Sequence, residues 1–199
     1  FLPMLKYMGA VTLALAVQCL VVYQLLLFVF TRLNPLRFLK RFSPVMMFAF
    51  TTATSNATIP LSIDTLDKKI GVSKKISSFT IPLGATINMD GTSIMQGVAV
   101  IFIAQVYGME LTPAQLLTVI ATAMIASIGT AGIPSVGLIM LAMVLTSVGL
   151  PTEGIALIMG IDRILDMLRT AVNITGDAVC TTIVSSQNKE LDRSIFNRD

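Results

Sequence analysis

Histidine and tryptophan are both absent from this chain of 199 residues, and only 13% of its residues are charged. Without histidine, the chain cannot build a histidine metal centre or a Ser-His-Asp catalytic triad on its own. Soluble domains carry about a quarter charged residues. Here 54% of residues are hydrophobic and the mean hydropathy is +0.82, which predicts an integral membrane protein. The net charge is only +3, and we expect no nucleic-acid partner.

Cysteine is also scarce. Cys19 and Cys180 lie in apolar stretches without CxxC spacing, so we expect packing roles and no redox or metal chemistry. The chain begins with Phe1 inside an apolar segment, and we expect it to be a piece of a longer protein.

The long apolar runs predict the membrane segments. The uncharged run from Met8 to Phe30 is about 35 Å long as a helix, so residues 8–31 are predicted to span the membrane. Residues 45–66 are interrupted by a polar run and Pro60, and a basic loop flanks them on each side (Arg32, Arg37, Lys40 and Arg41; Lys68, Lys69, Lys74 and Lys75). Because basic loops favour the cytoplasm, residues 45–66 are predicted to form a re-entrant hairpin.

The second half of the chain repeats this pattern. Residues 76–107 are predicted to form a broken transmembrane helix, interrupted at Gly84 and at Asn88-Met89-Asp90-Gly91-Thr92. Residues 113–150 are predicted to form a second re-entrant hairpin, entering from the other side because no Lys or Arg flanks it. A transmembrane helix at 153–186 and a cytoplasmic tail at 187–199 complete the prediction.

The predicted fold class is therefore an all-α integral membrane protein. It is an inverted repeat of a re-entrant helical hairpin followed by a broken transmembrane helix. Discontinuous helices in matching positions point to a binding site near the middle of the membrane.

The last predicted helix carries a polar stripe. At 100° per residue its polar side chains fall within an arc of about 80°; they are Asp162, Asp166, Arg169, Asn173 and Asp177. An arginine fork binds a carboxylate, and an aspartate in the same cavity binds an ammonium group, so an amino acid with an acidic side chain would fit. The alternative interpretation is that Asp166 and Arg169 simply pair with each other.

Asp90 and the two hairpin tips are further candidates. Asp90 has no adjacent basic residue, so we expect it to face a cation, a proton or a distant arginine; alternatively, a protonated Asp90 fills a polar network. Unwinding is expected to free the carbonyls of Gly84, Thr86 and Asn88 for a cation such as Na⁺. Helices that start at a tip direct N–H groups toward it and attract carboxylates, although such tips are also common as plain turns.

Three motifs resemble those of the dicarboxylate/amino acid:cation symporter family, which includes the glutamate transporter homologues. They are Asn88 to Thr92, Ser127 to Pro134, and Asp162 to Asp177. The resemblance implies that the chain is the C-terminal part of a transport domain, which moves as an elevator with the second hairpin as its outer gate. It also implies a homotrimer for the full-length protein.

The resemblance implies roles for individual residues. Asp166 would bind the ammonium group, Arg169 and Thr92 the side-chain carboxylate, and Asn173 and the first tip the α-carboxylate. The substrate-binding set would be Ser55, Asn56, Thr92, Ile133, Gly137, Asp166, Arg169, Thr170 and Asn173. The Na⁺ ligands would be Gly84, Thr86, Asn88, Asp90, Ser127, Ile128, Thr130, Asn173 and Asp177.

The chain departs from the family pattern at two places. The first tip is rich in serine in the family, whereas here it reads Thr54-Ser55-Asn56. An additional arginine of the family would fall at Ala53 or Met167, and Arg163 could compensate for its absence.

We therefore expect a secondary active symporter that carries aspartate or glutamate with Na⁺ and that needs no cofactor beyond this coupling ion. Symport of a C4-dicarboxylate or a neutral amino acid, with Na⁺ or H⁺, is the alternative. An intramembrane aspartyl protease is disfavoured because an arginine and an asparagine share the stripe, and a passive channel because the stripe carries both signs. The expected location is a cell membrane, either the bacterial inner membrane or a plasma membrane, with several spans in contact with membrane lipid.

Overall fold

The first element is a long helical rod. In a computed structural model that describes residues 2–128 and 134–198, the rod consists of α1 (Leu2–Val17), a π-helical turn (Gln18–Val22) and α2 (Tyr23–Thr31). It extends the predicted 8–31 segment toward the N-terminus and ends at Arg32, which is left-handed with φ 59°.

A pair of helices follows, α3 (Pro35–Thr52) and α4 (Ser55–Thr65), continued by a π-helical turn (Leu66–Ile70). The first arm was predicted to begin at residue 45, which is wrong: the helix begins at Pro35. The Asn34 side chain caps it by accepting a hydrogen bond from the backbone N–H of Arg37 at 3.1 Å, and proline suits the first helical position. The basic residues Lys40 and Arg41 therefore lie on a helix and not in a loop.

The broken helix consists of α5 (Lys74–Ile87) and α6 (Asp90–Val106), which are separated at Asn88 and Met89, within the predicted interruption. A second helical pair follows, α7 (Pro113–Ser127) and α8 (Val136–Ser147). A capping box between Thr112 and Gln115 starts α7. Most of the predicted second tip, including Thr130 and Ile133, lies outside the described residues.

The last predicted helix, 153–186, is interrupted. A short 3₁₀ turn (Thr152–Gly154) leads into α9 (Ile155–Met159), and the long helix α10 (Asp162–Gln187) starts only after Gly160 and Ile161. Glycine is disfavoured inside a helix by about 1 kcal/mol, so Gly160 weakens the helix at this point. The predicted tail contains one more short helix, α11 (Arg193–Asn197).

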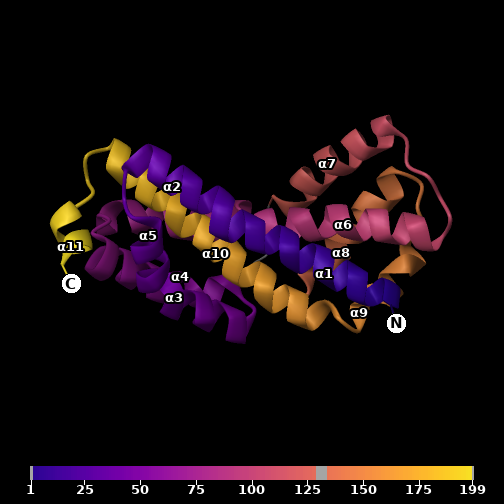
Figure 1. The fold of residues 1–199 in the computed structure, drawn as a ribbon, viewed down its shortest axis with the longest axis horizontal. Coiled ribbons are helices and arrows are strands. Elements are labelled where there is room, and N and C mark those ends of the chain that lie inside the picture. The colour runs from indigo at the N-terminus through magenta and orange to yellow at the C-terminus, as the bar shows by residue number, and fades with distance from the viewer. Residues whose placement is uncertain (1, 129–133, 199) are drawn as a thin grey trace.

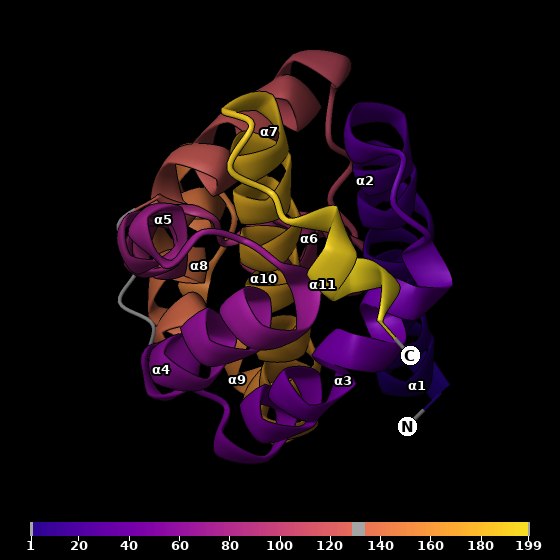
Figure 2. The ribbon, with the colours of Figure 1, turned by 90° about the vertical axis from the view of Figure 1, so that its left-hand side faces the viewer.

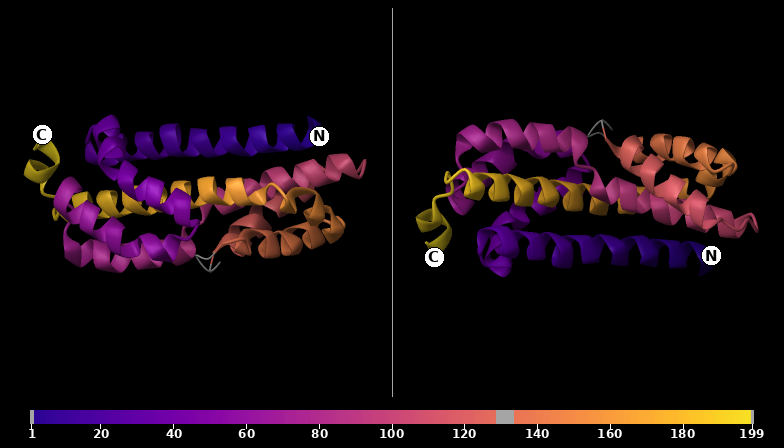
Figure 3. Two further views of the ribbon diagram at one scale, coloured as in Figure 1. Left: turned by 90° about the horizontal axis from the view of Figure 1, so that it is seen from below. Right: turned by 90° about the horizontal axis from the view of Figure 1, so that it is seen from above.

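Helix α10 runs through the middle of the molecule (Figure 1). It packs against α1, α2, α3, α5 and α6, and the end-on view in Figure 2 shows it surrounded by the other helices. Helices α3, α4 and α5 gather at one end, whereas α6, α7 and α8 gather at the other, with α1 and α2 along one side (Figures 1 and 3). The polar stripe of α10 therefore lies in the protein interior.

The outer surface is strongly apolar. Leu117, Ile125 and Ile139 are 68%, 69% and 71% exposed. Among the residues that the structure describes, two helical segments are long and apolar enough to cross a membrane, Leu2–Thr31 and Lys74–Val106. Large apolar side chains on this scale suit contact with lipid better than contact with water.

Candidate functional site

The site is built around the stripe on α10. All five of its polar residues are buried; they are Asp162, Asp166, Arg169, Asn173 and Asp177. The prediction that this stripe faces the interior is thus confirmed. Arg163, which the spacing puts off the stripe, is exposed and does not lie with them.

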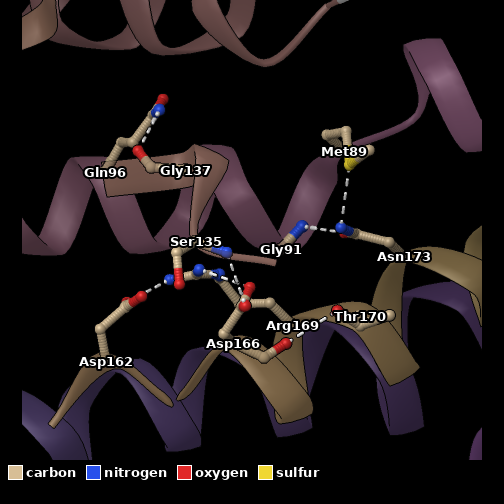
Figure 4. A network of polar contacts seen from close by, with 10 residues as sticks. All are labelled: Met89, Gly91, Gln96, Ser135, Gly137, Asp162, Asp166, Arg169, Thr170 and Asn173. Carbon is tan, nitrogen blue, oxygen red and sulfur yellow. Dashed lines mark hydrogen bonds and ion pairs between the residues drawn. The ribbon is translucent and has the colours of Figure 1, made fainter. Parts of the chain in front are cut away.

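Arg169 is held between two carboxylates (Figure 4). Its Nη1 donates to Asp162 Oδ1 and its Nη2 to Asp166 Oδ1, each at 2.8 Å. The alternative interpretation that Asp166 and Arg169 pair is therefore confirmed for this structure, and Asp162 joins them. Among the described residues, Arg169 Nε and Asp162 Oδ2 are buried without a hydrogen-bond partner, so the cluster retains capacity for a ligand.

Asp166 also reaches the second helical pair. Its Oδ2 accepts a hydrogen bond from the backbone N–H of Ser135 at 2.9 Å, directly before α8 begins at Val136. The predicted attraction of a carboxylate to the N–H groups at a helix start is thus present, but the carboxylate is that of Asp166 and not that of a ligand. Ser135 is not among the predicted site residues, because a backbone donor leaves no side-chain signal in the sequence.

Gly137 brings α8 close to Arg169. A Cβ atom built on Gly137 would lie 3.3 Å from Arg169 Nη2 and 3.3 Å from Thr92 Cγ2, so the predicted residues Thr92, Gly137 and Arg169 meet here. Gln96 Nε2 donates to the Gly137 carbonyl at 3.4 Å (Figure 4). A side chain at position 137 would have to displace Arg169 and Thr92 by a few tenths of an ångström, so glycine favours the close approach of α8 to the guanidinium.

Asn173 and Thr170 are both engaged with backbone. Asn173 Oδ1 accepts from the Gly91 N–H at 2.8 Å, and its Nδ2 donates to Met89 Sδ at 3.3 Å. Thr170 Oγ1 donates to the Asp166 carbonyl at 2.8 Å. Asn173 therefore ties α10 to the break between α5 and α6.

A second polar cluster lies at this break, around Asp177. Asn88 Nδ2 donates to Asp177 Oδ1 at 2.8 Å, and a Cβ atom built on Gly84 would lie 2.5 Å from the same oxygen. The expectation that unwinding frees the Gly84 carbonyl is wrong. Helix α5 continues to Ile87, so this carbonyl accepts the backbone N–H of Asn88 at 2.8 Å.

Asp90 lies in a polar network. It accepts hydrogen bonds from Gln18 Nε2 at 3.1 Å and from the Tyr23 hydroxyl at 2.9 Å. Gln18 begins the π-helical turn and Tyr23 follows it, and such turns often occur at functional sites. Both donors were missed, because nothing in their sequence distinguishes them from ordinary residues of an apolar helix.

The remaining predicted residues are less closely connected. Ser127 is buried and its hydroxyl accepts from Ser93 Oγ at 2.8 Å, whereas Ile128, Thr86 and Asn56 are exposed. Ser55 is buried at the start of α4, a helix that packs on α10. Within residues 2–128 and 134–198, no hydrogen bond joins Ser55 or Asn56 to the Arg169 cluster.

Comparison with known proteins gives a consistent result. Residues 1–187 match the profile of the sodium:dicarboxylate symporter family. An excitatory amino acid transporter of Caenorhabditis elegans is 43% identical over 92% of this chain and 36% of its own length. Excitatory amino acid transporter 3 of Mus musculus is 43% identical (92% and 35%), and excitatory amino acid transporter 1 of Homo sapiens is 42% identical (97% and 35%). The chain spans about a third of the length of these curated relatives.

Proposed function

Because the chain belongs to the sodium:dicarboxylate symporter family, we propose that it forms the substrate- and cation-holding part of a secondary active symporter for acidic amino acids. The observation that carries this proposal is the buried cluster of Asp162, Asp166 and Arg169, which offers both signs of charge to one ligand. The excitatory amino acid transporters to which the chain is similar add support.

The cluster suggests how an acidic amino acid would bind. Its ammonium group would bind the Asp166 carboxylate, and its side-chain carboxylate would bind the guanidinium of Arg169, next to Thr92. Arg169 has one buried N–H without a partner among the described residues, and its two Nη groups have further N–H capacity. A ligand carboxylate at Arg169 would replace one charge-assisted hydrogen bond with another of the same kind, and the ligand ammonium group would pair with the Asp166 carboxylate that it displaces.

Substrate recognition also depends on the neighbouring helices. The amide of Asn173 would hold the α-carboxylate together with the first tip at Ser55 and Asn56, and Thr170 and Gly137 would close the site. The second helical pair would act as the outer gate, and the hydrogen bond from Ser135 to Asp166 supports this role because it joins the pair to the substrate residue. Movement of the whole unit as an elevator is part of the proposal.

Na⁺ would enter around the break between α5 and α6. One ion would use Asp177 with carbonyls of Gly84, Asn88 and Asn173, the Gly84 oxygen through the lone pair that its hydrogen bond with the Asn88 N–H does not use. Another ion would use Asn88 and Asp90. A further ion would use carbonyls of Thr86, Ser127, Ile128 and Thr130. The hydrogen bond between Asn88 and Asp177 supports the first of these sites, because it brings two oxygen-bearing side chains to the helix break.

Asp166 favours an amino acid over a C4-dicarboxylate. A dicarboxylate lacks an ammonium group, so its binding would leave Asp166 facing another anion. We propose that the full-length protein is a multi-pass protein of a cell membrane, surrounded by lipid and assembled as a homotrimer.

The decisive experiment is uptake of isotope-labelled aspartate into proteoliposomes that contain the full-length protein, with and without an inward Na⁺ gradient. Accumulation that depends on the gradient is the expected result. Uptake driven by a proton gradient alone would overturn the Na⁺ sites and leave the Arg169 cluster as the substrate site. Accumulation of succinate but not of aspartate would overturn the amino-acid assignment.

A further inference from the structure

Helix α11 lies at the end of the molecule opposite the N-terminus, near the end of α2 (Figure 1). A polar pocket is lined there by residues of α11, of the start of α3 and of the turn after α2. Its volume is about 350 Å³, and three of its lining residues are arginines: Arg32, Arg37 and Arg193. Asn34 and Asn197 add amide groups to the lining. None of these residues belongs to the substrate or cation clusters on α10.

The local charge of this pocket is positive. Arg193 Nη2 donates to the backbone carbonyl of Thr31 at 2.7 Å, and the neighbouring Arg41 also donates to backbone carbonyls, including that of Ile195 at 3.0 Å. Carbonyl acceptors position a guanidinium but leave its full positive charge in place. In the described part of the chain, Arg32, Arg41 and Arg193 make no ion pair with a carboxylate.

The nearest acidic residues in the sequence are engaged elsewhere. Asp192 accepts a hydrogen bond from the Ser194 N–H at 2.8 Å, which caps α11, and Glu190 pairs with Lys75 at 3.6 Å. Arg32 and Arg193 are therefore able to bind an anion from outside the chain.

Apolar side chains adjoin the pocket on the helix that leads into it. Phe28 and Phe30 are 45% and 53% exposed in the last turns of α2, and Leu36 is 77% exposed in the first turn of α3. The Arg32 guanidinium lies over the Phe28 ring, 5.7 Å from its centroid. Exposed aromatic residues directly beside exposed arginines are the arrangement expected where lipid tails end and headgroups begin.

We propose that this pocket binds the phosphate group of an anionic phospholipid in the cytoplasmic leaflet. Arg32 and Arg193 are the residues that bind the phosphate, and the apolar surface at Phe28, Phe30 and Leu36 contacts the acyl chains. Guanidinium groups suit phosphate because they donate parallel hydrogen bonds to its oxygens. Bound lipid would also fix α11 to the ends of α2 and α3, since Arg193 lies on α11.

The test uses the purified full-length protein in detergent and native mass spectrometry with short-chain phosphatidylglycerol, and with short-chain phosphatidylcholine as the neutral comparison. We expect phosphatidylglycerol to bind and phosphatidylcholine to bind much more weakly. Each arginine near an anionic headgroup contributes about a fivefold gain in affinity. The double variant Arg32→Gln/Arg193→Gln should therefore bind phosphatidylglycerol about 25-fold more weakly.

Two matched variants make the result specific. Lys69→Gln/Lys74→Gln removes two exposed charges outside the pocket lining and should change the affinity less than threefold, whereas Arg32→Lys/Arg193→Lys keeps the charge and should retain part of the affinity. The proposal would be overturned if Arg32→Gln/Arg193→Gln bound phosphatidylglycerol as tightly as the wild type. It would also be overturned if Lys69→Gln/Lys74→Gln lost as much affinity as Arg32→Gln/Arg193→Gln.

Inorganic phosphate distinguishes the two sources of the ligand. If millimolar phosphate displaces phosphatidylglycerol from the wild type, the pocket recognises the phosphate group without the acyl chains and also binds soluble anions. If phosphate has no effect while Arg32→Gln/Arg193→Gln still loses the lipid, the acyl chains are needed as well and the ligand is a membrane lipid. Retained Na⁺-dependent aspartate uptake by the variant in neutral liposomes shows that it folds.

Discussion

Asp166 and Ser135 are joined by a hydrogen bond of 2.9 Å between the Asp166 carboxylate and the Ser135 backbone N–H. The same carboxylate binds Arg169 through its other oxygen. One side chain thus connects the long central helix, its buried guanidinium and the start of α8. A ligand that takes Asp166 or Arg169 must therefore change the contact between α10 and the second helical pair.

The variant Asp166→Asn isolates the charge of this residue. Asparagine keeps an oxygen that can accept the Ser135 N–H, but it no longer attracts an ammonium group. We expect aspartate uptake to fall about 100-fold or more, in line with the loss of a buried charge pair. Uptake of labelled aspartate in proteoliposomes measures this. Asp64→Asn, which removes a carboxylate from an exposed pair with Lys68, should change uptake less than twofold.

Replacement of Arg169 by cysteine should abolish the uptake of acidic amino acids and admit neutral ones such as alanine. It also leaves two buried carboxylates without their cation, so we expect a loss of stability of about 3–5 kcal/mol, measurable as a lower melting temperature. Arg169→Lys keeps the charge without the planar fork, and it should fold while transporting aspartate at least tenfold more slowly. Unchanged aspartate uptake by Arg169→Lys and Arg169→Cys would contradict the substrate assignment.

Asn88 offers a test of the cation cluster. Asn88→Ala removes the side-chain amide, which donates the 2.8 Å hydrogen bond to Asp177 and carries a candidate oxygen ligand for Na⁺, but it keeps the backbone carbonyl. We expect the Na⁺ concentration for half-maximal aspartate binding to rise about tenfold, roughly the loss of one hydrogen bond to a charged group. A fluorescence titration with Na⁺ at fixed aspartate measures it. The side-chain amide of the exposed Asn188 donates to the Val184 carbonyl at 2.8 Å, and the control variant Asn188→Ala should leave the Na⁺ dependence unchanged.

A pair of glycine substitutions tests the close approach at Asp177. The Cβ of Gly84→Ala would lie 2.5 Å from Asp177 Oδ1 and must displace that carboxylate, whereas Gly97→Ala in α6 has no atom within 4 Å of its Cβ. We expect Gly84→Ala to weaken Na⁺-dependent binding at least fivefold, through the displaced carboxylate. Gly97→Ala should leave binding unchanged and stabilise the helix by about 0.5–1 kcal/mol. An equal effect of the two substitutions on Na⁺ dependence would contradict the role of Asp177.

The sequence predicted the helical class and the buried stripe because both depend on local spacing and on the scarcity of charge. Asp162, Asp166, Arg169, Asn173 and Asp177 share one helical face wherever the helix packs. The start of α3 lies outside the predicted hairpin although Asn34 and Pro35 form a recognisable helix start, because the basic residues that follow resemble a loop in the sequence. The break at Gly160 was missed because a single glycine in an apolar run is often tolerated.

The contacts between elements could not be predicted in the same way. Ser135 takes part through its backbone N–H, and Gln18 and Tyr23 reach Asp90 only because the π-helical turn and the packing of α1 and α2 bring them there. Which carboxylates an arginine selects also depends on packing. Spacing alone suggested Asp166 at three residues' distance, whereas Asp162, seven residues away, binds Arg169 at the same 2.8 Å.

The polar interior described above also sets an order of events. Four carboxylates (Asp90, Asp162, Asp166 and Asp177) and one guanidinium (Arg169) leave it with a formal charge of −3. An acidic amino acid brings a further net negative charge, which would meet repulsion in a medium of low polarity. In the proposed symporter, monovalent cations would therefore enter before the anion or together with it. Substrate affinity should accordingly increase with a power of the cation concentration greater than one. Substrate should also dissociate more slowly when the cation concentration is high on the side of the membrane that the site faces.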